Sequence, residues 1–320
     1  MRLLVTGCAG FIGSHLVDRL LAGGHSVVGI DDLSLGRLEK LLHLGTPNFR
    51  FHRADLLDGR TLPEIFRSEP IDAVFHLAAN SDIENGAANP AIDFERTLLT
   101  TVRVLEAMRQ STTKQILFAS SSAVYGELPG KLREDSGPLL PVSHYGAAKL
   151  AAEAFLSSFC ESFGYRCWIF RFPNVVGARA THGVIFDFIR RLRENPRRLL
   201  VKGDGKQSKP YLLVDELLDA IFFTWKHASD RRNLFNLGTD SEIVVNELAR
   251  IVAEEMELPR VAIAHTGGRG GWVGDVPRFQ YDLSRIHALG WRARYSASEA
   301  VRQAVRAQLA WDVPARRVAK

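Results

Sequence analysis

The sequence has few cysteines and no long apolar run. Cys8, Cys160 and Cys167 are odd in number and lack CxxC spacing, so neither a disulfide framework nor a metal site is supported. We therefore expect reduced thiols and a cytoplasmic protein. The first apolar run, LLVTG, ends at a glycine turn and is too short for a signal peptide, and no stretch of membrane length follows. The sequence thus predicts no membrane partner.

The sequence has only a small excess of positive charge, with 41 Lys+Arg against 36 Asp+Glu and a net charge of +5. Such an excess fits a nucleic acid or an anionic small ligand. Because the basic residues are spread along the chain, we predict a small ligand and no nucleic acid. The densest basic stretch, RRLRENPRRLL from Arg190, is typical of a solvated helix face, with phosphate binding as the alternative.

Apolar runs alternate with stretches of helical periodicity through the first half of the chain. RLLVTG precedes FIGSHLVDRLLAGG, and SVVGIDD, FRFHRADL, IDAVFHLAA and KQILFASSS follow as strands. A helix is expected from about Ile92 to Arg109, between the last two strands. Continuous apolar strands between helices indicate a parallel sheet that is covered on both faces. The predicted fold is a doubly wound α/β domain, and 320 residues leave room for a second domain or lobe.

A glycine motif joins the first strand to the first helix. In TGCAGFIGSHL, Gly7, Gly10 and Gly13 have the spacing GxxGxxG. A glycine triplet in this context favours a dinucleotide: the first permits a tight turn, the second lets backbone approach the pyrophosphate, and the third allows close helix packing. The helix N-terminus would supply free N–H groups and a positive field. The alternative is a tight turn alone.

Carboxylates end the next two strands. Asp31 lies about 20 residues beyond the glycine motif, where it can accept hydrogen bonds from both ribose hydroxyls and would repel a 2′-phosphate. This predicts NAD rather than NADP. Asp32 is its neighbour, and Asp55 in HRADL could meet the adenine amino group. Ordinary turns at the ends of the strands are the alternative for all three.

Tyr145 and Lys149 are four residues apart in VSHYGAAKLAAEAF, on a predicted helix capped by Ser143. A cation near a phenol favours the phenolate and lowers its pKa, so the pair predicts a base that is usable near neutral pH. An amphipathic helix with an incidental pair is the alternative. Three serines in ILFASSSAVYG follow a strand at the edge of the sheet where ligands bind; a serine-rich turn is the alternative there.

With these motifs in place, the sequence resembles the extended short-chain dehydrogenases/reductases, and within them the nucleotide-sugar epimerases and dehydratases. The matching segments run in family order over nearly the whole chain: TGCAGFIGSHL, DDLSLGR, VFHLAA, SSSAVYG, YGAAK, RFPNVVG, GDGKQSKPYLLVDEL and FNLGT.

The resemblance implies a Rossmann-type dinucleotide-binding domain, residues 1–173 and 211–238, and a smaller C-terminal α/β substrate-binding lobe, residues 174–210 and 239–320. It implies Tyr145 as base, Lys149 as its electrostatic partner and ribose anchor, and Ser121 as the third catalytic group. The implied NAD site comprises Gly7, Gly10, Phe11, Ile12, Gly13, Asp31, Asp32, Asp55, Leu56, Leu77, Ala78, Ala79, Tyr145 and Lys149. The implied substrate site comprises Ser121, Ser122, Asn174, Lys209 and Arg269.

Dehydratases of this branch carry an acidic residue or pair directly after the catalytic serine or threonine, whereas this chain has Ser122 and Ala123. It therefore looks most like the NAD-dependent 4-epimerases of UDP-hexoses, enzymes of polysaccharide biosynthesis that work through a 4-keto sugar. Two positions depart from the pattern: Thr97 replaces an asparagine, and Lys209 replaces a diphosphate-binding arginine. Lysine cannot form the bidentate fork of arginine, so the nucleotide and the sugar stay open.

Other interpretations remain open at this stage. The same fold serves nucleotide-sugar dehydratases and 4-keto reductases, and a dinucleotide domain can act as a redox sensor or contact RNA. The joint presence of Ser121, Tyr145 and Lys149 favours an enzyme. The helices at Ile92 to Arg109 and Tyr145 to Phe163 resemble the pair that forms the dimer interface of this superfamily, which predicts a homodimer; the alternative is that both stripes face the sheet.

Overall fold

The structure is a computed structural model that describes residues 1–268, 270–271 and 274–318. It divides into two compact units. The first comprises Met1–Gly126, Leu139–Arg171 and Trp225–Phe235, and the second comprises Glu127–Pro138, Phe172–Thr224 and Asn236–Lys320. The predicted domain boundaries describe a functional division and stay a prediction; the compact units place residues 127–138 and 211–224 in the second unit.

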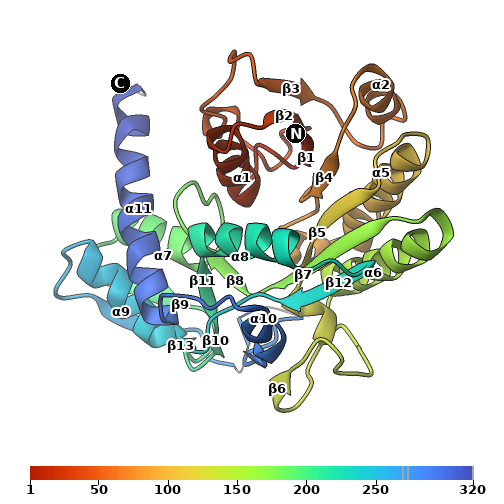
Figure 1. The fold of residues 1–320 in the computed structure, drawn as a ribbon. Coiled ribbons are helices and arrows are strands. Elements are labelled where there is room, and N and C mark those ends of the chain that lie inside the picture. The colour runs from red at the N-terminus through yellow and green to blue at the C-terminus, as the bar shows by residue number, and fades with distance from the viewer. Residues whose placement is uncertain (269, 272–273, 319–320) are drawn as a thin grey trace. The chain divides into compact units, whose positions relative to one another are not determined.

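A seven-stranded sheet forms the centre of the first unit, in the order β12-β7-β5-β4-β1-β2-β3 (Figure 1). Its strands are β1 (Arg2–Thr6), β2 (Ser26–Asp31), β3 (Phe49–Arg53), β4 (Ala73–His76), β5 (Gln115–Ser121), β7 (Arg166–Phe172) and β12 (Arg232–Asn236). The pairs that β1 forms with β2 and β4 are parallel, as are β2 with β3 and β4 with β5. The predicted doubly wound α/β fold is therefore confirmed.

Helices cover both faces of this sheet. The helical segments of the unit are α1 (Phe11–Ala22), η1 (Leu38–Lys40), α2 (Thr61–Ser68), α3 (Ile83–Ala88), α4 (Pro90–Asp93), η2 (Phe94–Leu99), α5 (Thr100–Arg109), η3 (Ser122–Tyr125) and α6 (His144–Phe163). Apolar residues of α2, α5 and α6 share one core with alternate residues of the strands, and α1 lies on the other side of the strands (Figure 1). Side chains that alternate along a strand supply both cores.

The predicted helix from Ile92 to Arg109 is interrupted, because η2 is a π-helical turn between α4 and α5. Threonine hydroxyls bond to carbonyls of this turn: Thr100 Oγ1 donates to the carbonyl of Arg96 at 2.9 Å and Thr101 Oγ1 to that of Thr97 at 2.7 Å. Periodicity alone does not reveal this interruption, since α-helical and π-helical turns bury similar apolar positions.

The second unit combines short strand pairs with helices. Its strands are β6 (Lys131–Leu132), β8 (Asn174–Val176), β9 (Arg198–Val201), β10 (Ser208–Lys209), β11 (Tyr211–Leu213), β13 (Ile243–Val244), β14 (Ala262–His265) and β15 (Gln280–Tyr281). Its helices are α7 (Val184–Glu194), most of α8 (Val214–His227), α9 (Val245–Glu255), α10 (Ser284–Leu289) and α11 (Ala297–Val318). Apolar residues of α7, α9 and α11 pack around β9 and β11 in a core of its own.

In the described part of the chain, no helix has both the length and the apolar character that a membrane span requires.

Candidate active site

The first strand and the first helix are joined by a turn that requires glycine. Gly7 has φ +70°, and a Cβ there would lie 2.8 Å from the backbone nitrogen of Ala78, the second residue after β4. At Gly13 a Cβ would overlap the carbonyl oxygen of Gly7. The helix cap, Gly10, offers no side chain to the first N–H groups of α1. These groups, which include those of Phe11 and Ile12, are therefore available to an anion.

This turn lies where the strand order reverses. Thr6 of β1 pairs with Ile30 of β2 on one side and with His76 of β4 on the other. Ligands of open α/β sheets bind at the carboxyl ends of strands at such a switch point. Leu77, Ala78 and Ala79 follow β4 directly at this edge, which places them beside the glycine turn.

A buried histidine holds the two strand ends together. The ring of His76 bonds through Nδ1 to Thr6 Oγ1 at 2.7 Å and through Nε2 to Thr101 Oγ1 at 2.9 Å. Burial, with a smaller effect from Lys149, lowers the pKa of His76 to about 3. The ring is therefore neutral, and it acts as a fixed bridge between β1, β4 and α5.

The carboxylates predicted for the cofactor lie at the ends of β2 and β3. Asp31 Oδ2 accepts a hydrogen bond from the backbone N–H of Ala9 at 2.9 Å, and Oδ1 accepts one from that of Leu33 at 2.9 Å. Burial raises the pKa of Asp31, and these two bonds oppose the shift. Each oxygen keeps a lone pair that fits a ribose hydroxyl. Asp32 and Asp55 are partly exposed, while the neighbouring Leu56 is buried.

The phenol, the ammonium group and the serine come together at the start of α6. Ser143 caps this helix, with its Oγ accepting from the N–H of Gly146 at 3.1 Å, as predicted. A Cβ at position 146 would overlap the carbonyl oxygen of Ala123, so glycine lets α6 lie against η3, directly after Ser121 at the end of β5. Ser121 is hydrogen-bonded to Tyr145.

Lys149 is fixed one turn further along α6. Its side chain is buried, and Nζ donates to the carbonyl of Ala119 at 2.6 Å. The same Nζ lies 4.7 Å from the ring centroid of Phe118 and 5.8 Å from that of Tyr145. Lys149 is thus held between the end of β5 and the phenol, where its charge can act on Tyr145 and its remaining hydrogens can reach a ligand.

The ionisation of this pair differs from our expectation for the chain without ligand. Burial raises the pKa of Tyr145 to about 12, opposed by its hydrogen bond with Ser121. Burial also lowers the pKa of Lys149 to about 7, against the attraction of Glu153 and Asp93. The expectation that the lysine makes the phenol acidic is therefore wrong for the ligand-free chain, because desolvation disfavours both charged forms.

An ion pair beneath the lysine was missed by sequence reasoning. Glu153, the next residue on the same helical face as Lys149, accepts from Arg171 of β7 at 3.0 and 2.7 Å and from Ser120 Oγ at 2.5 Å. Both partners are buried, and the guanidinium carbon of Arg171 lies 4.6 Å from the ring centroid of Tyr125. The sequence shows that Glu153 follows Lys149 by four residues and so shares its helical face, but this spacing does not identify Arg171 as the partner of Glu153.

Glu153→Gln is expected to lower the free energy of unfolding by about 3 kcal/mol or more, because it leaves a buried guanidinium group without its carboxylate. Urea unfolding followed by circular dichroism measures this loss. Glu161→Gln is the matched control on the same helix: Glu161 pairs with Arg231 at the surface, and its loss should cost under about 1 kcal/mol. Equal stabilities of the two variants would contradict the assigned role.

A second buried acid lies near the catalytic pair. Asp93 accepts from Asn80 Nδ2 at 2.9 Å through Oδ1, while its Oδ2 has no hydrogen-bond partner within the described chain. Burial raises its pKa, and the hydrogen bond from Asn80, with a smaller effect from Lys149, opposes this shift. Thr97, at the position where the family has an asparagine, is buried and accepts from the backbone N–H of Asn80 at 3.1 Å.

The residues predicted to bind substrate are divided between the two units. Ser122 begins η3 in the first unit, next to Ser121. Asn174 begins β8 in the second, and its buried Nδ2 has no hydrogen-bond partner in the described structure; its role in substrate binding stays a prediction. Lys209 is buried and pairs with Asp275 at 2.5 Å. Arg269 lies outside the described residues.

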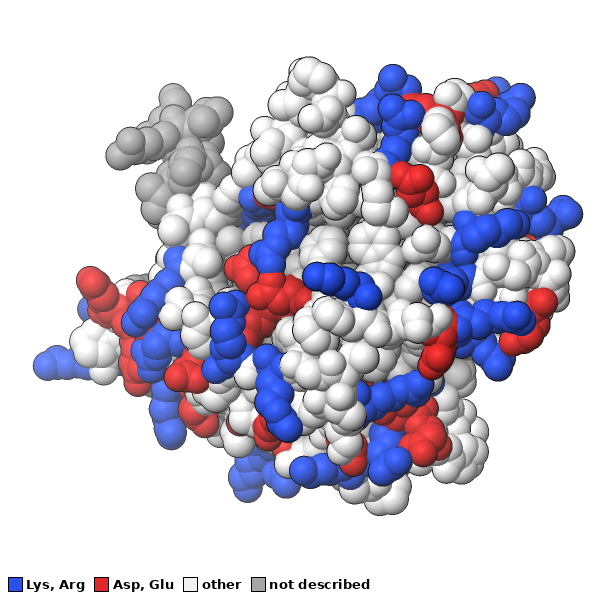
Figure 2. All heavy atoms as spheres, in the orientation of Figure 1, with Lys and Arg blue, Asp and Glu red and all other residues white. Residues whose placement is uncertain are grey.

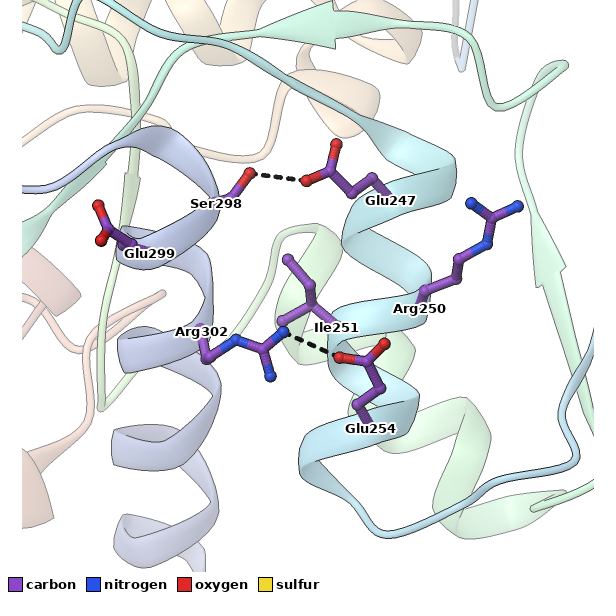
Figure 3. A pocket seen from close by; sticks show the side chains of 7 residues that line it. All are labelled: Glu247, Arg250, Ile251, Glu254, Ser298, Glu299 and Arg302. Carbon is purple, nitrogen blue, oxygen red and sulfur yellow. Dashed lines mark hydrogen bonds and ion pairs between the residues drawn. The ribbon is translucent and has the colours of Figure 1, made fainter.

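In the second unit, a cavity of about 280 Å³ lies between α9 and α11 (Figure 3). Four of its polar side chains bond to one another in pairs, Ser298 to Glu247 at 2.7 Å and Arg302 to Glu254 at 2.8 Å. On the face shown in Figure 2, basic and acidic side chains are interspersed, which does not favour nucleic-acid binding there.

Taken together, a glycine turn at the switch point of a parallel sheet and a Ser–Tyr–Lys cluster beside it define a dinucleotide-dependent enzyme of the short-chain dehydrogenase/reductase type. The family model described as "NAD dependent epimerase/dehydratase family" matches residues 3–238. The chain therefore belongs to this family. The prediction of an NAD-dependent epimerase is confirmed.

Relatives and solved structures agree with this membership. The UDP-glucose 4-epimerase of Mycolicibacterium smegmatis is 34% identical over 312 residues, which cover 95% of this chain and 97% of the relative. A crystal structure of UDP-galactose 4-epimerase is 37% identical with a TM-score of 0.86 and covers 98% of this chain and 100% of its own. UDP-glucose 4-epimerase from Thermotoga maritima, solved with UDP-glucose, is 28% identical with a TM-score of 0.88, and the match covers 100% of both chains.

Proposed function

We propose that the protein inverts C4 of a UDP-linked hexose through a transient 4-keto sugar, with NAD regenerated in each cycle. The observation that carries the proposal is the cluster of Ser121, Tyr145 and Lys149 at the carboxyl edge of the sheet, beside the glycine turn. The names of the relatives, which are epimerases acting on UDP-sugars, support the choice of nucleotide and carbon.

The residues present fit NAD. The first N–H groups of α1, to which Gly10 offers no side-chain cap, suit a diphosphate, and Asp31 suits a ribose. When bound, NAD would accept a hydride from C4 of the sugar and return it to the opposite face, and its oxidised ring would add a positive charge. The chain itself holds the adenosine end, the diphosphate and the proton that leaves the sugar hydroxyl.

Tyr145 is the group that moves this proton. Its Oη accepts the proton of the C4 hydroxyl and gives it back after the sugar has turned over, while Ser121 donates a hydrogen bond to the same substrate oxygen. Protonated Lys149 stabilises the phenolate across the short distance to the ring. Because burial opposes both charges in the ligand-free chain, the base becomes effective only when additional positive charge arrives with the ligands.

The product decides between this reaction and its alternatives. Purified protein is incubated with UDP-, GDP- and CDP-hexoses, and the products are read by chromatography and by NMR at the sugar C4. We expect a UDP-hexose to reach equilibrium with its C4 epimer without net change in NADH absorbance. Loss of water would identify a dehydratase, and stoichiometric NADH consumption a reductase. Salt-sensitive RNA binding without sugar turnover would support the non-enzymatic alternative.

We also propose a homodimer formed through η2 and α6. Phe94 and Phe155 expose 57% and 43% of their surface, and they lie on helices that contact each other; exposed apolar side chains that lie close together mark interaction surfaces. Phe155→Arg should shift the sedimentation coefficient to that of a monomer. Leu140→Arg, at an exposed leucine of the loop between β6 and α6, should leave it unchanged. Identical sedimentation of wild type and Phe155→Arg would contradict this interface.

A further inference from the structure

An arginine that the proposed reaction does not use joins two of the carboxylates assigned to NAD. Arg96 Nη1 donates to Asp55 Oδ2 at 2.7 Å and to Asp32 Oδ2 at 3.1 Å. The three side chains are 39%, 37% and 28% exposed, respectively. Arg96 therefore connects the segment after β2 with the segment after β3, two strands that are direct neighbours.

The backbone that carries Arg96 is specialised. Arg96 lies in the π-helical turn η2, and its carbonyl is satisfied by Thr100 Oγ1 at 2.9 Å. Single π-turns are rare and are frequent at functional sites. The next residue, Thr97, is buried and bonds to the chain after β4. Thr97 thus attaches the turn to the segment after β4, while Arg96 extends to the loops after β2 and β3.

Each of the two aspartates is held from both sides. Asp32 Oδ1 accepts from the N–H of Ser34 at 2.9 Å, and Asp55 Oδ1 accepts from that of Leu57 at 2.9 Å. The second oxygen of each carboxylate is bonded to Arg96. A carboxylate fixed in this way keeps further lone pairs for a ligand but loses its freedom to rotate, which favours binding by pre-organisation.

The arginine also changes the local charge. Asp31, Asp32 and Asp55 place three carboxylates at adjacent strand ends, and an anionic dinucleotide must bind beside them. Lys40 lies near Asp31, where its charge opposes in small part the rise in the pKa of Asp31 that burial causes, whereas Arg96 is bonded to the other two. Without Arg96 the loops after β2 and β3 would present less compensated negative charge to the diphosphate.

We propose that Arg96 is a positioning residue for the adenosine half of the dinucleotide, which holds Asp32 and Asp55 where the adenine and its ribose bind. This inference rests on the proposed placement of NAD. The proposal assigns different residues to the two halves of the cofactor: binding of the adenosine half depends on Arg96, while binding of the nicotinamide half depends on the region of Tyr145 and Lys149.

The experiment compares Arg96→Met and Arg96→Lys with wild type in the full-length protein. Isothermal titration calorimetry on protein freed of NAD measures the affinities for AMP and for nicotinamide mononucleotide, and a chase of the NAD-loaded protein with excess NAD measures the release of bound NAD. For Arg96→Met we expect AMP to bind about tenfold more weakly, the amount that a hydrogen bond to a charged group contributes. NAD release should accelerate by a similar factor, whereas the affinity for nicotinamide mononucleotide should not change. Arg96→Lys should recover part of the loss, because a single nitrogen makes both bonds.

Arg103→Met is the matched control. Arg103 lies seven residues further along the same helical stretch and is exposed, so its removal changes the net charge equally and should leave AMP binding as in wild type. A double variant tests whether Arg96 acts on AMP through Asp55. In a chain that already carries Asp55→Asn, Arg96→Met should weaken AMP binding by a much smaller factor than it does in wild type.

Two results would overturn the inference. One is unchanged AMP affinity in Arg96→Met; the other is an equal loss for AMP and nicotinamide mononucleotide, which would indicate general damage to the unit. Failure of wild type to bind AMP at all would instead refute the proposed cofactor placement, so the two proposals fail in distinguishable ways.

Discussion

Tyr145→Phe is expected to lower kcat by about 10²- to 10⁴-fold, the contribution of a positioned acid or base. The substitution removes only the phenolic oxygen, which is the atom that exchanges the proton with the C4 hydroxyl in the proposed reaction. Ring packing on α6 is retained, so the protein should fold and keep its NAD. The rate is measured as the interconversion of the two UDP-hexose epimers by NMR, with bound NAD determined in the same samples.

Tyr165→Phe serves as the control for losing a buried phenolic oxygen elsewhere in the same unit. Tyr165 donates to the carbonyl of Leu105 at 3.2 Å, and its removal should cost about 1 kcal/mol of stability without changing kcat. If Tyr145→Phe kept the full epimerisation rate, the assignment of the base would be wrong whatever the effect on stability.

The glycine turn after β1 and the cap of α6 could be predicted from local sequence because each depends on residues close together in the chain. Gly7 and Gly13 contact each other across one turn, and Ser143 caps α6 three residues before Gly146. Parallel strands buried on both faces read as continuous apolar runs. The fold class therefore follows from local patterns and from the rules that connect strands and helices.

The environment of the catalytic pair could not be predicted in the same way. Glu153 is visible as the next residue on the face of Lys149, but its partner Arg171 comes from β7, and Ser120 from β5. Arg96 lies 41 residues from Asp55. Such pairings depend on which strands become neighbours. The direction of the pKa shifts depends in turn on burial, which a spacing of four residues does not report.

Lys149→Met should also reduce epimerisation by about 10²-fold or more, because it removes the cation that stabilises the phenolate. The same substitution should raise the free energy of unfolding, although it lowers the activity. The ammonium group is buried, and its pKa in the folded chain is about 7 against an ordinary value of 10.5. Folding therefore requires a charged group to enter a poorly solvated site at low pH, with Ala119, Glu153 and Asp93 compensating only in part.

The sign of the pH dependence follows from proton binding. Between pH 7 and 10 the unfolded chain holds the proton of this lysine more often than the folded chain does, so the free energy of unfolding rises with pH. The penalty is complete below about pH 7 and disappears above the ordinary pKa. In protein freed of NAD, we expect Lys149→Met to be more stable than wild type by about 2–3 kcal/mol at pH 6. The difference should shrink steadily towards pH 10.

Urea unfolding at a series of pH values gives this difference directly, and the exposed Lys226→Met controls for the loss of an ammonium group at the surface. A Lys149→Met protein that is less stable than wild type at pH 6 would show that Glu153 and Asp93 compensate the buried charge fully. The expected result means that this lysine is kept at a cost in stability, and that the bound ligands, by bringing further charge to the site, set its protonation during the reaction.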